Sequence, residues 1–250
     1  MARVPAQVSA LLEEIAGRLP SILGRNLVGV YLYGSLTQKA FDPARSDVDC
    51  IVVTRRDLTD AQFRRLEAWL TRAGGSNPWA KRLQMLFLIR DEVLTMNSKA
   101  CLYQFGRLAR SGSDGNPIIW VNVLESGIVL YGPPPGSFVP PITSETLLAA
   151  LEREVGYLHE EIVEKPEGEW RDVPSYRTYA VLTLCRILYS HRKGAVVSKK
   201  RAAAWALKNL PEEWHELIRR ALASKGSSPL PLRRIRRFIA FADAKLKARR

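Results

Sequence analysis

The sequence predicts an α+β protein of two domains, an N-terminal α/β domain with a mixed sheet followed by a C-terminal all-α helical bundle. Helical and strand-like apolar patterns alternate over the first 135 of its 250 residues. The proline-rich segment PPPGSFVPP then interrupts the chain at 133–141. Only helical patterns follow it, which is typical of a bundle packed beside an α+β module. We therefore expect a first domain at 1–135 and a second at 136–250.

The expected elements of the first domain follow from apolar periodicity and from the residues that punctuate it. LVGVYLY is a short β-rich run that ends at Gly34-Ser35, so it predicts a strand and then a turn. Asp57 and Thr59 are suited to open a helix, and Gly74-Gly75 to close it. In chain order we expect a helix at 5–23, strands at 27–33 and 48–53, a helix at 60–73, a strand at 83–89 with a short helical piece after it, and a helix passing into a last strand over 120–132.

The second domain is expected to be helical throughout. Proline, glycine and serine separate its apolar-periodic stretches and set their limits. These stretches are 143–163, 175–192, 198–209, 211–224 and 232–247.

Composition restricts the class of protein. The apolar share of 46% and the charged share of 25% are ordinary for a globular protein. No run of 18 apolar residues is present, and the first twenty residues form an amphipathic pattern instead of a signal peptide. The three cysteines are scattered through apolar stretches, which favours buried free thiols in a reducing compartment. We expect a cytoplasmic protein without a membrane partner.

The net charge of +13 favours an anionic partner, such as a nucleotide, a nucleic acid or an anionic surface. The alternative is a solubilising surface, since the basic stretch RRIRRFIAFADAKLKARR also fits a solvated helix face. Nucleic-acid binding is not expected, because the sequence has no recognition motif and no clustered aromatic platform.

The segment YGSLTQKAFDPARSDVD, residues 33–49, carries the clearest chemical signal. At the start of a strand, Asp47 and Asp49 project from the same face and repel each other unless a cation lies between them. Hard carboxylate ligands suit Mg²⁺, which takes one or two of them together with phosphate oxygens. The turn at Gly34-Ser35 offers backbone N–H groups where a phosphate can approach, and Ser46 adds a hydroxyl. The alternative for the aspartates alone is a solvated strand end.

This segment, extended to YGSLTQKAFDPARSDVDCIVV, resembles the signature of the nucleotidyltransferase superfamily, and specifically of the aminoglycoside (streptomycin/spectinomycin-type) adenylyltransferases. Residues 179–211, YAVLTLCRILYSHRKGAVVSKKRAAAWALKNLP, are similar to the second-domain motif of these enzymes. SGIVLYGPP at 126–134 matches their last strand. The similarity covers both domains in the same order.

The resemblance implies an antibiotic-resistance transferase, a Mg²⁺-dependent enzyme that moves AMP from ATP to a hydroxyl of an aminoglycoside or aminocyclitol. Such an enzyme is expected to be a monomer with ATP as co-substrate. The resemblance assigns the metal to Asp47 and Asp49, and the triphosphate to Ser35 and Ser46 beside Gly34. It also matches Arg186 and Lys199 to the phosphate-binding cations of the family. For both residues an exposed helix position is the alternative, and Lys200 and Arg201 beside Lys199 strengthen it there.

One position departs from the family pattern. Family members carry a third carboxylate, the general base, on a strand antiparallel to the metal strand, and residues 82–93 align with that strand without a gap. The base position is then Gln84, and an amide cannot take a proton at neutral pH. Three explanations stay open: the glutamine traps an otherwise complete enzyme, it is natural in a slow enzyme or a nucleotide binder, or Asp91 or Glu92 serves instead.

The positions that contact the antibiotic in the family also differ. Leu108 replaces a tryptophan, and Tyr176 and Tyr179 replace an acid and a polar residue, which argues against streptomycin as the acceptor. The acceptor is therefore predicted only as a small molecule with a hydroxyl group. The alternative function is a catalytically inactive nucleotide-binding or regulatory protein of the same fold.

Overall fold

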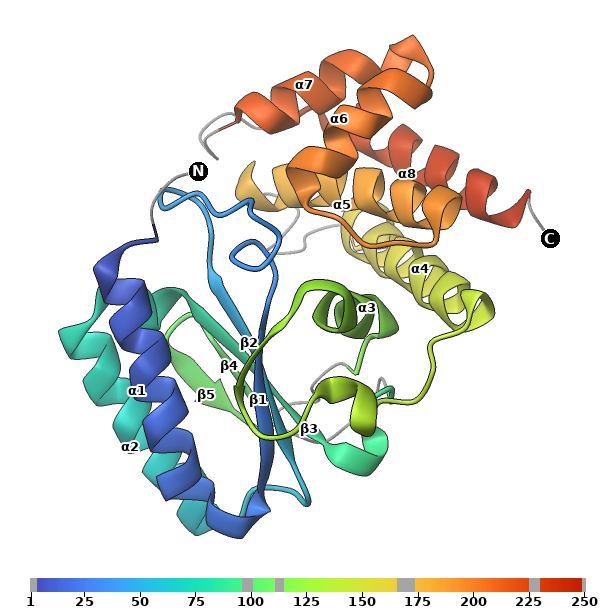
Figure 1. Ribbon diagram of the computed structural model, residues 1–250. Coiled ribbons are helices and arrows are strands. Elements are labelled where there is room, and N and C mark those ends of the chain that lie inside the picture. The colour runs from blue at the N-terminus through green and yellow to red at the C-terminus, as the bar shows by residue number, and fades with distance from the viewer. Residues whose placement is uncertain (1–3, 96–100, 111–114, 166–173, 225–229, 249–250) are drawn as a thin grey trace. The chain divides into compact units, whose positions relative to one another are not determined.

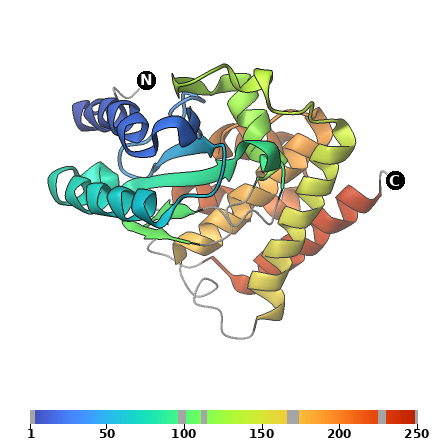
Figure 2. The same ribbon diagram turned by 90° about the horizontal axis from the view of Figure 1, so that it is seen from below.

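The computed structural model describes residues 4–95, 101–110, 115–165, 174–224 and 230–248. The chain divides into two compact units, residues 1–141 and 142–250, shown from two directions in Figure 1 and Figure 2. The first unit holds a sheet with helices, and the described part of the second is helical, as the sequence predicts.

The first unit is built on a six-stranded mixed sheet in the order β5-β4-β3-β2-β1-β6. Strands β2 and β3 pair in parallel, and the other neighbours pair antiparallel. The strands are β1 (Leu27–Tyr33), β2 (Val48–Thr54), β3 (Leu83–Ile89), β4 (Leu102–Gln104), β5 (Arg107–Ala109) and β6 (Ile128–Tyr131), and the helices are α1 (Ala6–Leu23), α2 (Asp60–Ser76) and α3 (Pro117–Ser126).

Both faces of the sheet are covered, which explains why β1, β2 and β3 are nearly continuous apolar runs. Helices α1 and α2 lie on one face and α3 on the other (Figure 1). Val48, Cys50 and Val52 belong to the core that includes α1 and α2. Because side chains alternate along a strand, Asp49 points to the α3 face. The first residue of β2 on that face is therefore a polar one, Asp49.

Helix α2 shows which local signals were reliable. Thr59 caps its N-terminus, as expected from the sequence, and the structure adds a capping box with Gln62. The predicted end at Gly74-Gly75 is wrong, because the helix continues to Ser76 and ends before Asn77-Pro78. Strands β4 and β5 were not predicted, since three residues each are too few to show a strand period.

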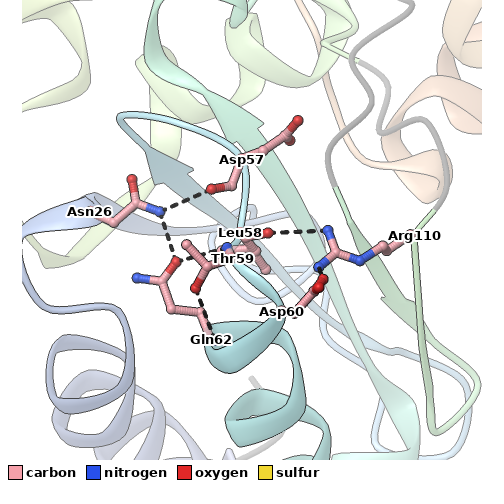
Figure 3. A network of polar contacts seen from close by, with 7 residues as sticks. All are labelled: Asn26, Asp57, Leu58, Thr59, Asp60, Gln62 and Arg110. Carbon is pink, nitrogen blue, oxygen red and sulfur yellow. Dashed lines mark hydrogen bonds and ion pairs between the residues drawn. The ribbon is translucent and has the colours of Figure 1, made fainter.

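A polar network closes the C-terminal end of β2 (Figure 3). The side-chain amide of Asn26 donates to Gln62 Oε1 at 3.2 Å, and Gln62 Nε2 donates to the carbonyl of Leu23 at 3.0 Å. Arg110 donates to the carbonyl of Leu58 at 3.1 Å and to Asp60 Oδ1 at 2.7 Å. These bonds fix the β2–α2 connection against the rest of the unit.

The second unit is a bundle around α5. Its core includes apolar side chains of α5 together with Trp214 and Phe238, whose ring centroids lie 4.9 Å apart. Helix α5 contacts each of the other helices of the unit. These are α4 (Ser144–His159), which continues into a π-helical turn (Glu160–Glu164), α5 (Pro174–Lys193), α6 (Lys199–Asn209), α7 (His215–Ala223) and α8 (Leu232–Lys247). Across the described residues, no helix is both long and apolar enough to cross a bilayer.

Candidate metal and nucleotide site

The turn after β1 is built against the carboxylate of Asp49. Tyr33, the last residue of β1, pairs with Asp49 on β2, so Gly34 follows directly beside that side chain. Gly34 has a φ of 80°, and a Cβ at this position would overlap Asp49 Oδ2. Only glycine combines this backbone conformation with so close an approach. The Gly-Ser turn and the second aspartate therefore lie side by side.

The N–H of Gly34 is bonded within the protein. It donates to Asn122 Oδ1 of α3 at 2.9 Å, and Asn122 Nδ2 donates to Ser126 Oγ at 2.8 Å. Asn122 is buried at 5% exposure and lies between apolar neighbours on α3, so it fixes the turn from the α3 face. Sequence reasoning missed this residue, although a polar side chain within WVNVL of a buried helix was a usable signal.

Ser35 differs from its neighbours in the turn. The carbonyls of Gly34 and Ser35 accept hydrogen bonds from the N–H groups of Gln38 at 3.1 Å and Ala40 at 3.0 Å. The hydroxyl of Ser35 is buried, and nothing in the described part of the chain bonds to it. A buried hydroxyl without a partner costs about 1–3 kcal/mol, so this atom is suited to bind a ligand oxygen.

Ser46 has a role inside its own loop. Its hydroxyl accepts from the N–H of Asp42 at 2.9 Å, and its N–H donates to the carbonyl of Asp42 at 2.8 Å. These bonds close the turn that precedes β2. That Ser46 touches the triphosphate stays a prediction, and in this structure its hydroxyl shapes the loop.

The two aspartates have different surroundings. Asp49 is half-buried against Gly34, whereas the side chain of Asp47 is 63% exposed and lies 3.8 Å from Arg82 Nε. No three His, Cys, Asp or Glu side chains among the described residues gather as a metal-binding group. A divalent ion would therefore take Asp47 and Asp49 as its protein carboxylates and complete its shell with other oxygens. This donor set fits Mg²⁺, which is bound by one or two carboxylates together with phosphate and water.

Gln84 lies beside Asp49, but on a strand of the opposite sense from the one expected. β3 pairs parallel with β2, and Gln84 is the register partner of Asp49. The expectation of an antiparallel base strand is wrong. The parallel pairing follows because helix α2 connects the two strands as a crossover. Paired residues of neighbouring strands project to the same face, so the amide of Gln84 shares the face of Asp49.

Asp91 and Glu92 do not lie near this position. They belong to the short 3₁₀ turn Arg90–Glu92 that follows β3, whereas Gln84 is at the start of that strand. Asp91 forms an exposed ion pair with Arg90 at 2.9 Å. The structure therefore gives no support to either acid as a replacement base.

In the second unit, the predicted phosphate-binding cations lie near a pair of stacked tyrosines. The rings of Tyr176 and Tyr179 are 5.4 Å apart, and Lys199 Nζ lies 4.7 Å from the centre of the Tyr179 ring. The Tyr179 hydroxyl donates to Glu154 Oε1 at 3.2 Å. Burial, and then the Glu154 carboxylate, raise the pKa of Tyr179. The ring is thus a neutral, fixed support for the lysine ammonium group.

Arg186 lies on α5 between apolar neighbours and is half-buried. Its Nε is buried and has no hydrogen-bond partner within the described ranges. The alternative of a fully solvated helix arginine is therefore wrong. Arg186 has unmet hydrogen-bonding capacity, as a ligand-binding arginine requires.

Known proteins match this chain in both sequence and fold. Residues 137–230 match the family model of the aminoglycoside adenylyltransferase C-terminal domain. An aminoglycoside (3'') (9) adenylyltransferase of Shigella flexneri is 25% identical over 233 residues, covering 86% of this chain and 84% of the relative. A spectinomycin 9-adenylyltransferase of Staphylococcus aureus is 26% identical over 220 residues, covering 82% and 79%.

The same architecture occurs in a solved structure, that of a spectinomycin adenyltransferase from Enterococcus faecialis with ATP and spectinomycin. The TM-score is 0.72 at 19% sequence identity, and the match covers 96% of this chain and 98% of the other. The fold is therefore that of this enzyme. The family model and the relatives confirm the resemblance read from the sequence: the chain is similar to aminoglycoside adenylyltransferases over most of its length.

Proposed function

We propose that this protein is a Mg²⁺-dependent nucleotidyltransferase that transfers AMP from ATP to a hydroxyl of an aminoglycoside or aminocyclitol. The observation that carries the proposal is the placement of Gly34 against Asp49, followed by the buried hydroxyl of Ser35, which has no partner among the described residues. The names of the relatives, and the ATP and spectinomycin of the solved neighbour, support the substrate class.

The residues would divide the work as follows. Asp47 and Asp49 hold the metal ion, which supplies charge neutralisation on the triphosphate when it is bound. Ser35 donates to a phosphate oxygen, and Arg186 and Lys199 of the second unit serve as phosphate-binding cations. The acceptor oxygen bonds to the α-phosphorus, the bond to the bridging oxygen breaks, and pyrophosphate leaves.

In this proposal, Gln84 limits the rate of AMP transfer. Its amide can hold the acceptor hydroxyl by a hydrogen bond, but it cannot accept the hydroxyl proton at neutral pH. The proton then passes to solvent. A missing general base lowers a rate by about 10²–10⁴-fold, so the wild-type protein is expected to be a slow enzyme.

The test is pyrophosphate release from ATP with a panel of aminoglycosides and aminocyclitols. Wild-type protein should release it slowly with at least one acceptor, and Gln84→Glu should raise kcat by about 10²-fold or more. Asp91→Asn, at the other end of β3, is the matched control and should leave the rate unchanged. A Gln84→Glu rate equal to that of the wild type would refute the assignment of position 84.

The second candidate is a nucleotide-binding protein without turnover, and the amide at position 84 favours it. It predicts ATP binding that depends on Asp49, together with no pyrophosphate release in wild type or Gln84→Glu with any acceptor. The two candidates thus give the same binding result and opposite results for release.

A further inference from the structure

A single side chain, Arg82, holds the loop that delivers Asp47. Arg82 is the last residue of the 3₁₀ segment Pro78–Arg82, directly before β3. Its Nη1 donates to the carbonyl of Pro43 at 2.7 Å, and its Nη2 donates to the carbonyl of Ser46. Its Nε lies 3.8 Å from Asp47 Oδ1. One guanidinium thus contacts two carbonyls of the loop and the carboxylate that follows them.

The guanidinium is itself held in place. It lies over the ring of Trp79, 4.3 Å from the ring centre. Trp79 is buried, and its other ring contact is Phe41, at 5.4 Å. Phe41 is at the start of the same loop. Phe41 therefore contacts Trp79 at the start of the loop, and Arg82 binds the carbonyl of Ser46 near its end.

Strand register explains why this arginine is at this place. β2 and β3 are parallel, with Val48 opposite Leu83 and Asp49 opposite Gln84. Arg82 directly precedes Leu83, and Asp47 directly precedes Val48, so the arginine and the first aspartate lie side by side just before the two strands begin. Asp47 thus has a cation beside it, just before β3, and Asp49 has an amide beside it, on β3.

We propose that Arg82 is a positioning residue that holds the loop Asp42–Asp47 so that Asp47 and Asp49 bind a divalent cation together. The proposal rests on the proposed function in that it needs a cation site at these aspartates. Two carbonyl bonds from a rigid fork set the backbone of the loop, whereas the contact with exposed Asp47 is long and weak.

This role predicts the opposite sign from simple electrostatics. A guanidinium near a cation site repels the cation, so removing its charge alone should strengthen binding. If Arg82 positions the loop, removing it should weaken binding in spite of the lost repulsion. Loss of a residue that orients metal ligands typically costs about 10–100-fold in metal affinity.

The first measurement is Mn²⁺ binding to the full chain by electron paramagnetic resonance. Arg82→Met should weaken affinity about ten-fold or more. Arg45→Met is the matched control, because Arg45 lies in the same loop and its exposed guanidinium pairs with Asp42 at 3.7 Å. It removes the same charge and should bind Mn²⁺ as well as the wild type or better.

The second measurement needs no metal. Arg45 is exposed, so trypsin can cut after it, and the rate of appearance of fragment 1–45 reports the order of the loop. Arg82→Met should be cut several-fold faster than wild type. Arg82→Lys keeps the charge but lacks the rigid fork that holds both carbonyls, so it should also be cut faster. This variant provides the test if Arg82→Met does not fold.

Weaker Mn²⁺ binding and faster cutting together would support the positioning role. Mn²⁺ affinity equal to or higher than that of Arg45→Met would overturn it, and so would an unchanged cutting rate. If wild-type protein binds no Mn²⁺ at all, the proposed function fails, whereas the cutting rates still decide whether Arg82 holds the loop.

Discussion

The two ends of β2 contrast in how their polar groups are used. At the C-terminal end, the network of Asn26, Gln62 and Arg110 bonds side chains to carbonyls and to one another (Figure 3). At the N-terminal end, Asp49 lies against a glycine, and the hydroxyl of Ser35 has no partner among the described residues. At the C-terminal end, which we call the closed end, the polar groups bond to one another and stabilise the fold. The N-terminal end, which we call the open end, retains binding capacity, at a cost in stability that a ligand would offset.

The largest effect is expected from Gly34→Ala at the open end. The added Cβ would overlap Asp49 Oδ2, and the φ of 80° costs a residue with a Cβ about 1–2 kcal/mol. Asp49 must move, so ATP binding in the presence of Mg²⁺ should fall below detection by calorimetry. Gly106→Ala is the control, since Gly106 also has a positive φ of 75° but no atom within 4 Å of an added Cβ. That variant should lose stability and keep ATP binding.

A smaller effect is expected from Tyr179 in the second unit, which tests whether Lys199 acts on phosphate. Tyr179→Leu removes the ring beneath the ammonium group and should weaken ATP binding by about 0.5–2 kcal/mol. Tyr179→Phe keeps the ring and should bind ATP nearly as well as wild type. Adenosine binding should be unchanged in both variants, and an equal loss for adenosine would count against a phosphate role.

The smallest effect should come from the closed end. Arg110→Met removes the bonds to Leu58 and Asp60 and should lower the free energy of unfolding by about 0.5–1.5 kcal/mol in urea titrations. ATP affinity should not change. Arg90→Met, which breaks an exposed pair with Asp91, should cost less. A marked loss of ATP binding in Arg110→Met would contradict the division between the two ends.

Local pattern was enough to predict much of this arrangement. The apolar runs before Gly34 and after Asp47 were correctly interpreted as strands, because both are long and bounded by turn residues. The helix start at Thr59 was predicted in the same way. Two strands that bury both faces must pair, which brought Gly34 and Asp49 together.

Contacts between distant segments were not predictable in the same way. Arg82 acts on a loop some 36–39 residues earlier, and Asn122 on a turn 88 residues earlier. Neither spacing leaves a local signature. The parallel sense of β3 depends on the α2 crossover, which periodicity within β3 alone does not encode.

The most direct test of the open end is calorimetric titration of ATP with Mg²⁺ into wild-type protein and into Asp49→Asn, beside Asp60→Asn from the closed end as a matched control. Wild type and Asp60→Asn should bind ATP alike, and Asp49→Asn should lose most of that affinity while keeping the wild-type unfolding temperature within a few degrees. Binding that is unaffected by Asp49→Asn, or absent from the wild type, would contradict a metal and nucleotide site at this end of β2.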